Sequence, residues 1–132
     1  VYAFLKALGV SDAIAATDWL FMNYHAFDYW MQVEDGPGVE ELREATIANI
    51  LRCAAAAPVG QHSVLFDFAP TPYSPVALAA DSGLIERCLA TVAQGQQEDG
   101  GWWDEHNLSQ WRPWTTICAL LTLRDYSHPA LG

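Results

Sequence analysis

The sequence predicts an all-α fold, because its apolar residues recur with the spacing of helices and not with the alternation of strands. The 132 residues are 52% hydrophobic and 17% charged, a composition that excludes a disordered chain. Glycine, proline and small polar residues separate the apolar segments. Together these observations predict one domain of about six helices over residues 1–132.

Three helices are expected before residue 34. Residues 1–9 have the pattern of a helix end that closes at Gly9. A second helix begins at Ser11, whose hydroxyl can accept a hydrogen bond from the first turn, and continues to about Leu20. A third, short helix spans 25–33 and ends at the Gly-Pro-rich segment 34–38.

The fourth helix is expected from Val39 to about Ala57, because Pro58 then stops it. Residues 58–81 follow as a long irregular connection, in which Pro70, Pro72 and Pro75 forbid regular structure. Connections of this length are uncommon and often functional.

Two further helices complete the prediction. Ser82 is the expected cap of the fifth, and Pro113 is suited to the first turn of the sixth, which runs to about Tyr126. The helical spacing of apolar residues then predicts which side chains are buried. The expected core residues are Ile47, Ile50, Leu51, Ile85, Leu89, Val92, Ile117 and Leu120.

The charge balance restricts the partners. Sixteen acidic and six basic residues give a formal net charge of −10, which disfavours nucleic acid and membrane surfaces and favours a small amine-bearing substrate. No apolar run reaches the roughly 18 residues of a membrane-spanning helix. The first residues lack the basic start of a signal peptide, so the expected location is cytoplasmic.

The three cysteines, Cys53, Cys88 and Cys118, each lie in an apolar helical pattern. An odd number without a close pair does not indicate a disulfide framework, and no C-x-x-C indicates structural zinc. We therefore expect buried thiols that act as small hydrophobic residues, and no metal site.

Four of the six tryptophans lie between residues 102 and 114, after the segment Gln97-Glu98-Asp99-Gly100-Gly101. The two glycines can supply positive φ after a helix, and the glutamine can bond to backbone groups at the helix end. We expect Trp102 to stack over this turn and fix the next helix.

A Gln-rich Asp-Gly-Gly-Trp turn between helices resembles the prenyltransferase and squalene-cyclase repeat, the α/α toroid. Further ordered matches over residues 25–124 resemble an actinobacterial branch of these proteins, although Gln110 and Pro113 replace its usual acid and glycine. The matching segments are His25-Ala26-Phe27-Asp28, Asp67-Phe68-Ala69-Pro70 and Gln110-Trp111-Arg112-Pro113-Trp114-Thr115-Thr116.

This resemblance implies half of an α/α toroid that a partner chain completes, because a full ring has about twice as many helices as this sequence predicts. The partner is a copy of the chain or a different subunit. The chain looks like the small subunit of the two-subunit toroid enzymes of azinomycin- and vazabitide-type pathways. Those enzymes close an aziridine by displacing sulfate from an amine-bearing substrate, with no cofactor.

Two alternatives stay open: a non-catalytic assembly subunit, and a degenerate terpene-cyclase-like protein. The motifs of isoprenoid chemistry are missing, since the sequence has neither D-x-D-D nor D-D-x-x-D and no cysteine near a histidine. A shared fold does not carry the chemistry without the site.

His25 and Asp28, spaced i, i+3, are the candidate catalytic pair. They could exchange a proton with the substrate amine, or Asp28 could simply favour the dipole at the start of its helix. Asp67, before the proline-rich segment, could contact substrate or cap a turn.

Trp103, Trp111 and Trp114 could wall a pocket and hold a cation over a ring, or could be core residues. Arg112 could bind a sulfate or carboxylate through its fork, or fix the loop by an ion pair or ring stack. The acidic segment 104–106 has the pattern of a solvated loop.

Overall fold

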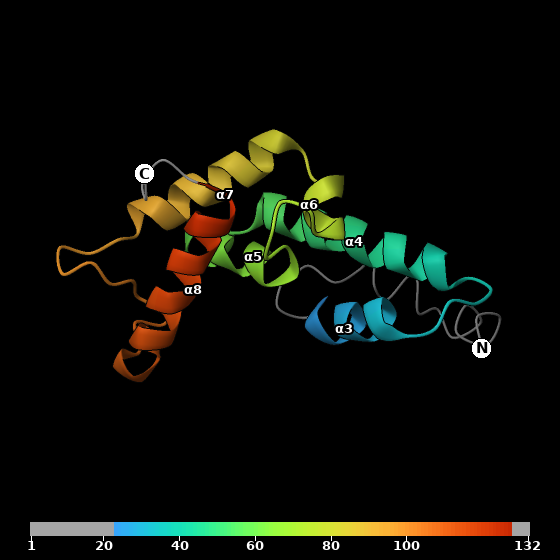
Figure 1. Cartoon of the computed structure of the whole chain (residues 1–132), viewed down its shortest axis with the longest axis horizontal. Coiled ribbons are helices and arrows are strands. Elements are labelled where there is room, and N and C mark those ends of the chain that lie inside the picture. The colour runs from blue at the N-terminus through green and yellow to red at the C-terminus, as the bar shows by residue number, and fades with distance from the viewer. Residues whose placement is uncertain (1–22, 128–132) are drawn as a thin grey trace. The chain divides into compact units, whose positions relative to one another are not determined.

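The computed structural model describes residues 23–127 and confirms an all-helical chain (Figure 1). This part holds six α-helices and two 3-10 helices and no strand. The helices expected over 1–9 and from Ser11 to Leu20 lie outside the described residues. None of the described helices is both long enough and apolar enough to cross a membrane.

The chain divides into two compact units, Val1–Ala57 and Pro58–Gly132. The single half-toroid domain over 1–132 therefore stays a prediction. Unit 1 contains helix α3 (Tyr24–Gln32) and helix α4 (Val39–Ala56), which confirm the third and fourth expected helices. They pack through buried Trp30 and Leu42.

Arg43 of α4 holds the end of α3 by three contacts. Its Nη2 and Nε atoms donate to the carbonyl oxygens of Val33 and Trp30, at 2.7 and 2.6 Å. Its Nη1 atom forms an ion pair with exposed Asp35. Because the last carbonyls of a helix have no partner within it, this guanidinium satisfies groups that would otherwise need water.

Unit 2 corrects the prediction of an irregular segment over 58–81. This segment forms a 3-10 helix η2 (Val59–Val64), the one-turn helix α5 (Leu65–Phe68) and the short helix α6 (Pro75–Ala79). Leu65 and Phe68 are fully buried, so apolar burial stabilises α5. Pro75 lies in the first turn of α6, where a missing N–H costs nothing.

The expected fifth and sixth helices are confirmed as α7 (Ser82–Gln94) and α8 (Arg112–Asp125), the latter preceded by the 3-10 turn η3 (Ser109–Trp111). Pro113 lies in the first turn of α8, as predicted. The expected cap of α7 was one residue too late. The N-cap is Asp81, whose carboxylate accepts a hydrogen bond of 2.7 Å from the Gly83 N–H.

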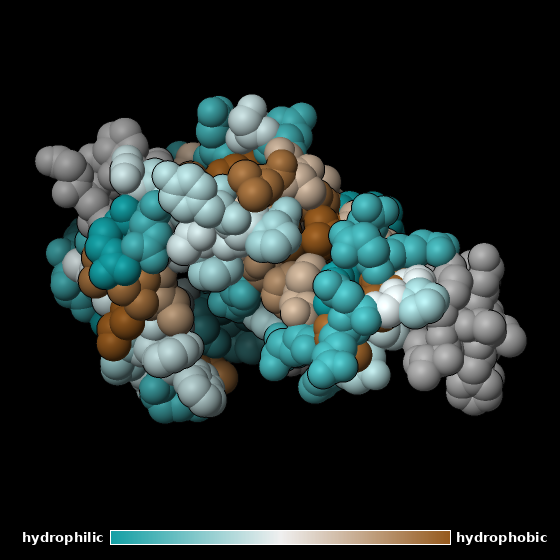
Figure 2. Space-filling view, turned by 45° about the vertical axis from the view of Figure 1, so that its right-hand side comes forward, coloured by the Kyte–Doolittle hydropathy of each residue, from teal (hydrophilic) through white to brown (hydrophobic). Residues whose placement is uncertain are grey.

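The expected core is confirmed in part for α4 and α7 and is wrong for α8. Ile50, Leu89 and Val92 are buried, and Ile47, Leu51 and Ile85 are partly buried. Ile117 and Leu120 are instead 50% and 39% exposed, because α8 packs through Ala119 and Leu123. Figure 2 shows apolar side chains at the surface among polar ones.

Tyr126 fixes the end of α8 to the proline-rich segment after α5. Its hydroxyl donates to the carbonyl oxygens of Ala69 at 2.7 Å and Thr71 at 3.1 Å. Its ring packs edge-on against Phe66. Burial raises the pKa of Tyr126 to about 12. This anchor sets where α8 stands relative to α5 within unit 2.

Candidate functional site

The turn between α7 and the tryptophan-rich loop forms as its sequence predicts. Gly100 has φ +85°, a conformation that favours glycine. The side-chain amide of Gln97 donates to the Gly95 carbonyl at the end of α7 at 2.9 Å, and that of Gln96 to Gly100 at 3.1 Å. Two glutamine side chains of the turn therefore donate hydrogen bonds to backbone carbonyls at the end of α7 and just after it.

Trp102 connects α7 to α8. The side chain is buried, and its indole N–H donates to the Val92 carbonyl in α7 at 2.6 Å. Its backbone N–H donates to the Thr116 hydroxyl in α8 at 3.0 Å. Trp102 thus fixes the following helix, as expected from the sequence, and brings two helices together at the loop.

Arg112, at the start of α8, forms an ion pair and also stacks on an aromatic ring. Of its two predicted roles, binding an anion or fixing the loop, these contacts correspond to the second. Two guanidinium nitrogens donate to the two carboxylate oxygens of Asp99, at 2.5 and 2.7 Å. The same guanidinium lies 4.6 Å from the centre of the Trp103 ring. The hydrogen bonds from Arg112 hold the pKa of Asp99 below its ordinary value.

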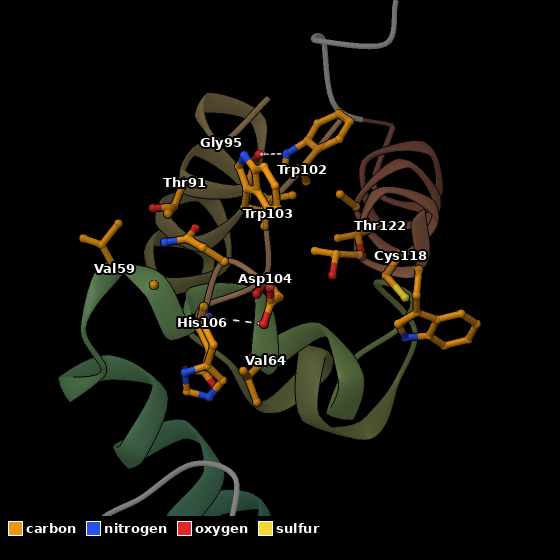
Figure 3. Close-up of a pocket in the computed structure, with 18 of the residues that line it drawn as sticks. Val59, Val64, Thr91, Gly95, Trp102, Trp103, Asp104, His106, Cys118 and Thr122 are labelled. Carbon is orange, nitrogen blue, oxygen red and sulfur yellow. Dashed lines mark hydrogen bonds and ion pairs between the residues drawn. The ribbon is translucent and has the colours of Figure 1, made fainter. Parts of the chain in front are cut away.

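A cavity of about 740 Å³ lies beside this loop, wholly within unit 2 (Figure 3). Side chains reach it from four directions: Val59 and Val64 from η2, Thr91 from α7, Trp103 from the loop and Cys118 from α8. Its volume lies in the range of small-molecule sites. The cavity is therefore the best-formed candidate site in the described residues.

The walls of the cavity combine carboxylates with indoles. Asp67, Asp104 and Glu105 line it, and so do Trp102, Trp103 and Trp114, but no lysine or arginine is among its lining residues. Burial, and then the carboxylate of Asp67, raise the pKa of the Cys118 thiol. The Asp67 carboxylate is therefore the second of two causes that favour the neutral form of the Cys118 thiol.

The acidic segment 104–106 is a largely exposed loop, as expected, and hydrogen bonds hold it in place. The Asp104 carboxylate accepts hydrogen bonds from the Leu108 N–H at 2.6 Å and the His106 N–H at 3.2 Å. Glu105 forms an ion pair of 3.5 Å with His106. These contacts hold the segment in a turn at the edge of the cavity.

The predicted site residues fall into separate groups. Asp67 and Trp103 line the cavity, whereas Trp111 and Arg112 are not among its lining residues. His25 and Asp28 belong to unit 1, where both are exposed and line a shallow depression with Tyr29. Asp28 is the fifth residue of α3, outside its first turn, so the interpretation as a dipole contact is wrong.

Several site residues were missed by reasoning from sequence. Asp99 was read only as a turn residue, although its spacing from Arg112 across one loop could have suggested a pair. Thr91 and Val59 reach the cavity from elements whose relative positions no local pattern encodes. Cys118 was expected to be buried, but it is half-buried in the cavity wall.

None of the three cysteines forms a disulfide. Burial raises the pKa of both Cys88 and Cys118, which favours the neutral form of these two thiols. In the part of the chain that the structure describes, no group of three or more histidine, cysteine or acidic side chains could hold a metal ion.

Comparison with known proteins gives no relative for this chain. No family model matches it, and no curated protein and no solved structure matches it either. The functional conclusion therefore depends on the geometry of the site and on the motifs of the sequence.

Proposed function

We propose that this chain is one subunit of a heteromeric α/α-toroid enzyme of natural-product biosynthesis. The observation that carries the proposal is the outer face of α8, which presents large apolar side chains to solvent. Trp114, Ile117 and Leu121 follow each other at i, i+3 and i+7 and are 64%, 50% and 42% exposed. Trp111 and Leu120, also exposed, lie beside them. We call these five residues the α8 face.

A face of this kind is unfavourable in water. Covering one Leu, Ile or Trp side chain stabilises a complex by about 1.5–3 kcal/mol. Contiguous apolar patches of such side chains mark protein interfaces. A partner helix with its own apolar stripe would cover the α8 face as neighbouring helices do in a toroid. A second copy can cover the same face, but two chains of net charge −10 repel each other. We therefore expect self-association to be weak and a different chain to bind more tightly.

The test is the association state of the full chain. We expect sedimentation velocity of the chain alone to show weak, concentration-dependent association through the α8 face. Ile117→Ser and Leu121→Ser should abolish it, whereas Leu78→Ser, which removes a 71% exposed leucine of α6, should leave it unchanged. A stable monomer at all concentrations, unchanged by these variants, would reject the proposal.

For the reaction, we propose ring closure to an aziridine. The substrate amine attacks the carbon that bears an O-sulfate, so a C–N bond forms while the C–O bond breaks. The sulfate leaves with the bonding electron pair, and the amine proton passes to Asp28 or His25. Orientation of the nitrogen in line behind the carbon would supply much of the rate, and no metal or redox cofactor is required.

Mass spectrometry of the assembled complex with an O-sulfated amino substrate tests this chemistry. We expect loss of sulfate together with formation of a ring product. In the same assay, Asp28→Asn and His25→Ala should lower the rate at least tenfold, in the range expected for an acid-base group. Retention of the sulfate by a complex that still assembles would reject the aziridine reaction and leave the subunit proposal standing.

A second candidate is a non-catalytic assembly subunit. It is favoured by one observation: the residues of the motif that resembles the toroid repeat bond to one another, as Arg112 does to Asp99 and Trp102 to Thr116. In that case Asp28→Asn and His25→Ala leave product formation unchanged, while Trp102→Ala prevents assembly. The two sets of variants therefore separate the candidates.

A further inference from the structure

We infer that the cavity of unit 2 is a binding site for a neutral ring that carries several hydroxyl groups, the chemistry of a sugar. This site goes beyond the proposed function and does not rest on it, because His25 and Asp28, the proton acceptors of the proposed reaction, belong to unit 1. The groups assigned to the ligand come from η2, α7 and the tryptophan-rich loop. The α8 face supplies none of them, so a partner chain on that face is compatible with the site.

The charges of the lining disfavour an ionic ligand. Asp67, Asp104 and Glu105 all line the cavity of about 740 Å³, so an anion would be repelled. None of these carboxylates is left unpaired for a cation. Glu105 lies 3.5 Å from the imidazole of His106, which also lines the cavity, and Asp67 and Asp104 both have contacts of their own. The lining therefore favours a neutral ligand.

Neutral polar side chains of the lining can bind such a ligand. The hydroxyl of Ser63 and the side-chain amides of Gln94 and Asn107 line the cavity and form no hydrogen bond to any of the described residues. Hydroxyl and amide groups both donate and accept. The Asp104 carboxylate adds acceptors, because each of its oxygens receives one N–H and has two lone pairs. A ligand with several hydroxyls, each of which also donates and accepts, satisfies these groups together.

Asn107 has a backbone conformation that is fixed before any ligand binds. Its φ is +54°, in the left-handed region that asparagine adopts more readily than most residues. The Asn107 N–H donates to the Asp104 carbonyl oxygen at 3.1 Å, so the turn is closed by the backbone and does not use the side-chain amide. A polar group on a fixed backbone binds a ligand with less loss of conformational entropy. We therefore assign the main hydrogen bonds of the loop to this amide.

Trp103 supplies the flat apolar surface on which a sugar ring packs. The C–H groups on one side of such a ring pack against an indole by dispersion, without any charge. The Arg112 guanidinium lies 4.6 Å from the centre of the Trp103 ring, but Arg112 is not a lining residue, whereas Trp103 is (Figure 3). The guanidinium therefore covers the face of the ring that is turned away from the cavity. Because Asp99 holds this guanidinium by two hydrogen bonds, the ring is positioned before a ligand binds.

The experiment compares six-membered rings that differ in their polar groups. The probes are the methyl glycosides of glucose, galactose and mannose, and the controls are cyclohexanol and glucuronate. Titration of the ¹⁵N-labelled full chain should give saturable shifts of the Trp103 indole N–H signal with at least one methyl glycoside, while the signal of buried Trp30 in unit 1 stays unchanged. Cyclohexanol, which lacks most of the hydroxyls, and glucuronate, which adds a carboxylate, should bind at least about tenfold more weakly.

Two matched pairs of variants locate the site. Asn107→Gly removes the amide and keeps the positive φ, so it should weaken binding of the methyl glycoside about tenfold. Ser127→Gly, at another described residue with positive φ, should not change binding. Trp103→Leu should also weaken binding about tenfold, whereas Tyr73→Leu, which removes an 83% exposed ring, should not.

Binding to the variants is followed by saturation transfer from the protein to the C–H protons of the sugar, because Trp103→Leu removes the indole signal. A far-UV circular dichroism melt of each variant verifies that it folds.

The absence of saturable shifts with all three methyl glycosides would overturn the inference, a result that does not depend on any variant. So would binding of cyclohexanol or glucuronate as tight as that of the methyl glycosides. Binding that both Asn107→Gly and Trp103→Leu leave unchanged would place the sugar elsewhere and overturn it as well. The titration needs neither a partner nor turnover. Its failure is therefore distinct from failure of the subunit proposal, which the sedimentation of the α8-face variants decides.

Discussion

Asp99 and Arg112 are joined by two parallel hydrogen bonds across the tryptophan-rich loop, so the loop is closed at its base by an ion pair. Asp99 also accepts a hydrogen bond from the Gly101 N–H at 3.1 Å. The pair positions Trp103 under the guanidinium, and Trp103 in turn forms part of the cavity wall. A substitution that breaks this ion pair is therefore expected both to lower the stability of the loop and to change the shape of the cavity.

The first prediction concerns acid. The pKa of Asp99 is lowered in the folded chain, so its ionised form stabilises the fold above its unfolded pKa of about 3.9, and this contribution disappears as pH falls through the folded pKa. Asp99→Asn should therefore lower the urea midpoint at pH 7, and should lower it less at pH 3. Glu98→Gln, one residue away and exposed, is the control. An equal loss at both pH values would contradict the role of the carboxylate.

The second prediction concerns Gly101, where a side chain has no room. A Cβ atom there would lie 2.9 Å from Arg112 Nη2 and 3.3 Å from the Thr116 hydroxyl. Gly101→Ala should therefore displace the guanidinium from Asp99 and lower the melting temperature. Gly60→Ala meets nothing within 4 Å and should not lower it. If the two alanines melt alike, the Arg112 guanidinium is not confined as described.

The third prediction concerns Trp102, whose ring and N–H can be removed separately. Trp102→Ala should destabilise unit 2 by about 3–5 kcal/mol, as large-to-small changes of buried aromatics do. Trp102→Phe keeps a ring but leaves the Val92 carbonyl without its donor, and should cost about 1–3 kcal/mol. Urea unfolding measures both. A phenylalanine variant as stable as the parent would mean that packing alone fixes α8.

The fourth prediction concerns Cys118 as a reporter of the cavity. Burial and the charge of Asp67 raise the pKa of its thiol, so little thiolate forms at pH 8. Asp67→Asn removes the second cause and should speed alkylation of Cys118 by iodoacetamide. Cys88, fully buried in α7, serves as the internal control when labelling is followed by peptide mass spectrometry. If labelling of Cys118 is unchanged, the Asp67 carboxylate lies too far from α8 to raise the pKa of this thiol.

The helices and the turn could be predicted from sequence because their determinants are local. Gly100 and Gln97 act within one turn, and Pro113 marks a helix start wherever the helix packs. The burial of α8 could not be predicted this way. Its apolar residues surround most of the helix, so spacing could not distinguish Ile117, which is exposed, from Ala119, which is buried.

The cavity was beyond sequence reasoning for a related reason. Asp67 and Cys118 lie on different helices, and only the packing of α8 brings the charge of one to the thiol of the other. The one-turn helix α5 was missed because the prolines at 70, 72 and 75 suggested irregular structure over the whole connection. They act only on the residues beside them, and Leu65–Phe68 ends before the first of them.

The last prediction concerns alkali and Tyr126. Its hydroxyl donates to two carbonyl oxygens, and its pKa rises from about 10 to about 12 on folding. The stability that this phenol contributes is complete below pH 10, and it is lost as pH rises through about 12, because the ionised form cannot donate. Tyr126→Phe should therefore cost about 1 kcal/mol at pH 8, and the difference from the parent chain should close by pH 12.

Urea unfolding of both chains between pH 8 and pH 12 measures this difference, with Tyr73→Phe as the control for an exposed phenol. Other groups titrate in the same range, but they do so equally in the parent and in Tyr126→Phe, so their effects cancel in the comparison. If the difference in the free energy of unfolding between the parent chain and Tyr126→Phe stays constant with pH, then the ring against Phe66, and not the hydroxyl, anchors α8 to the Ala69–Thr71 segment.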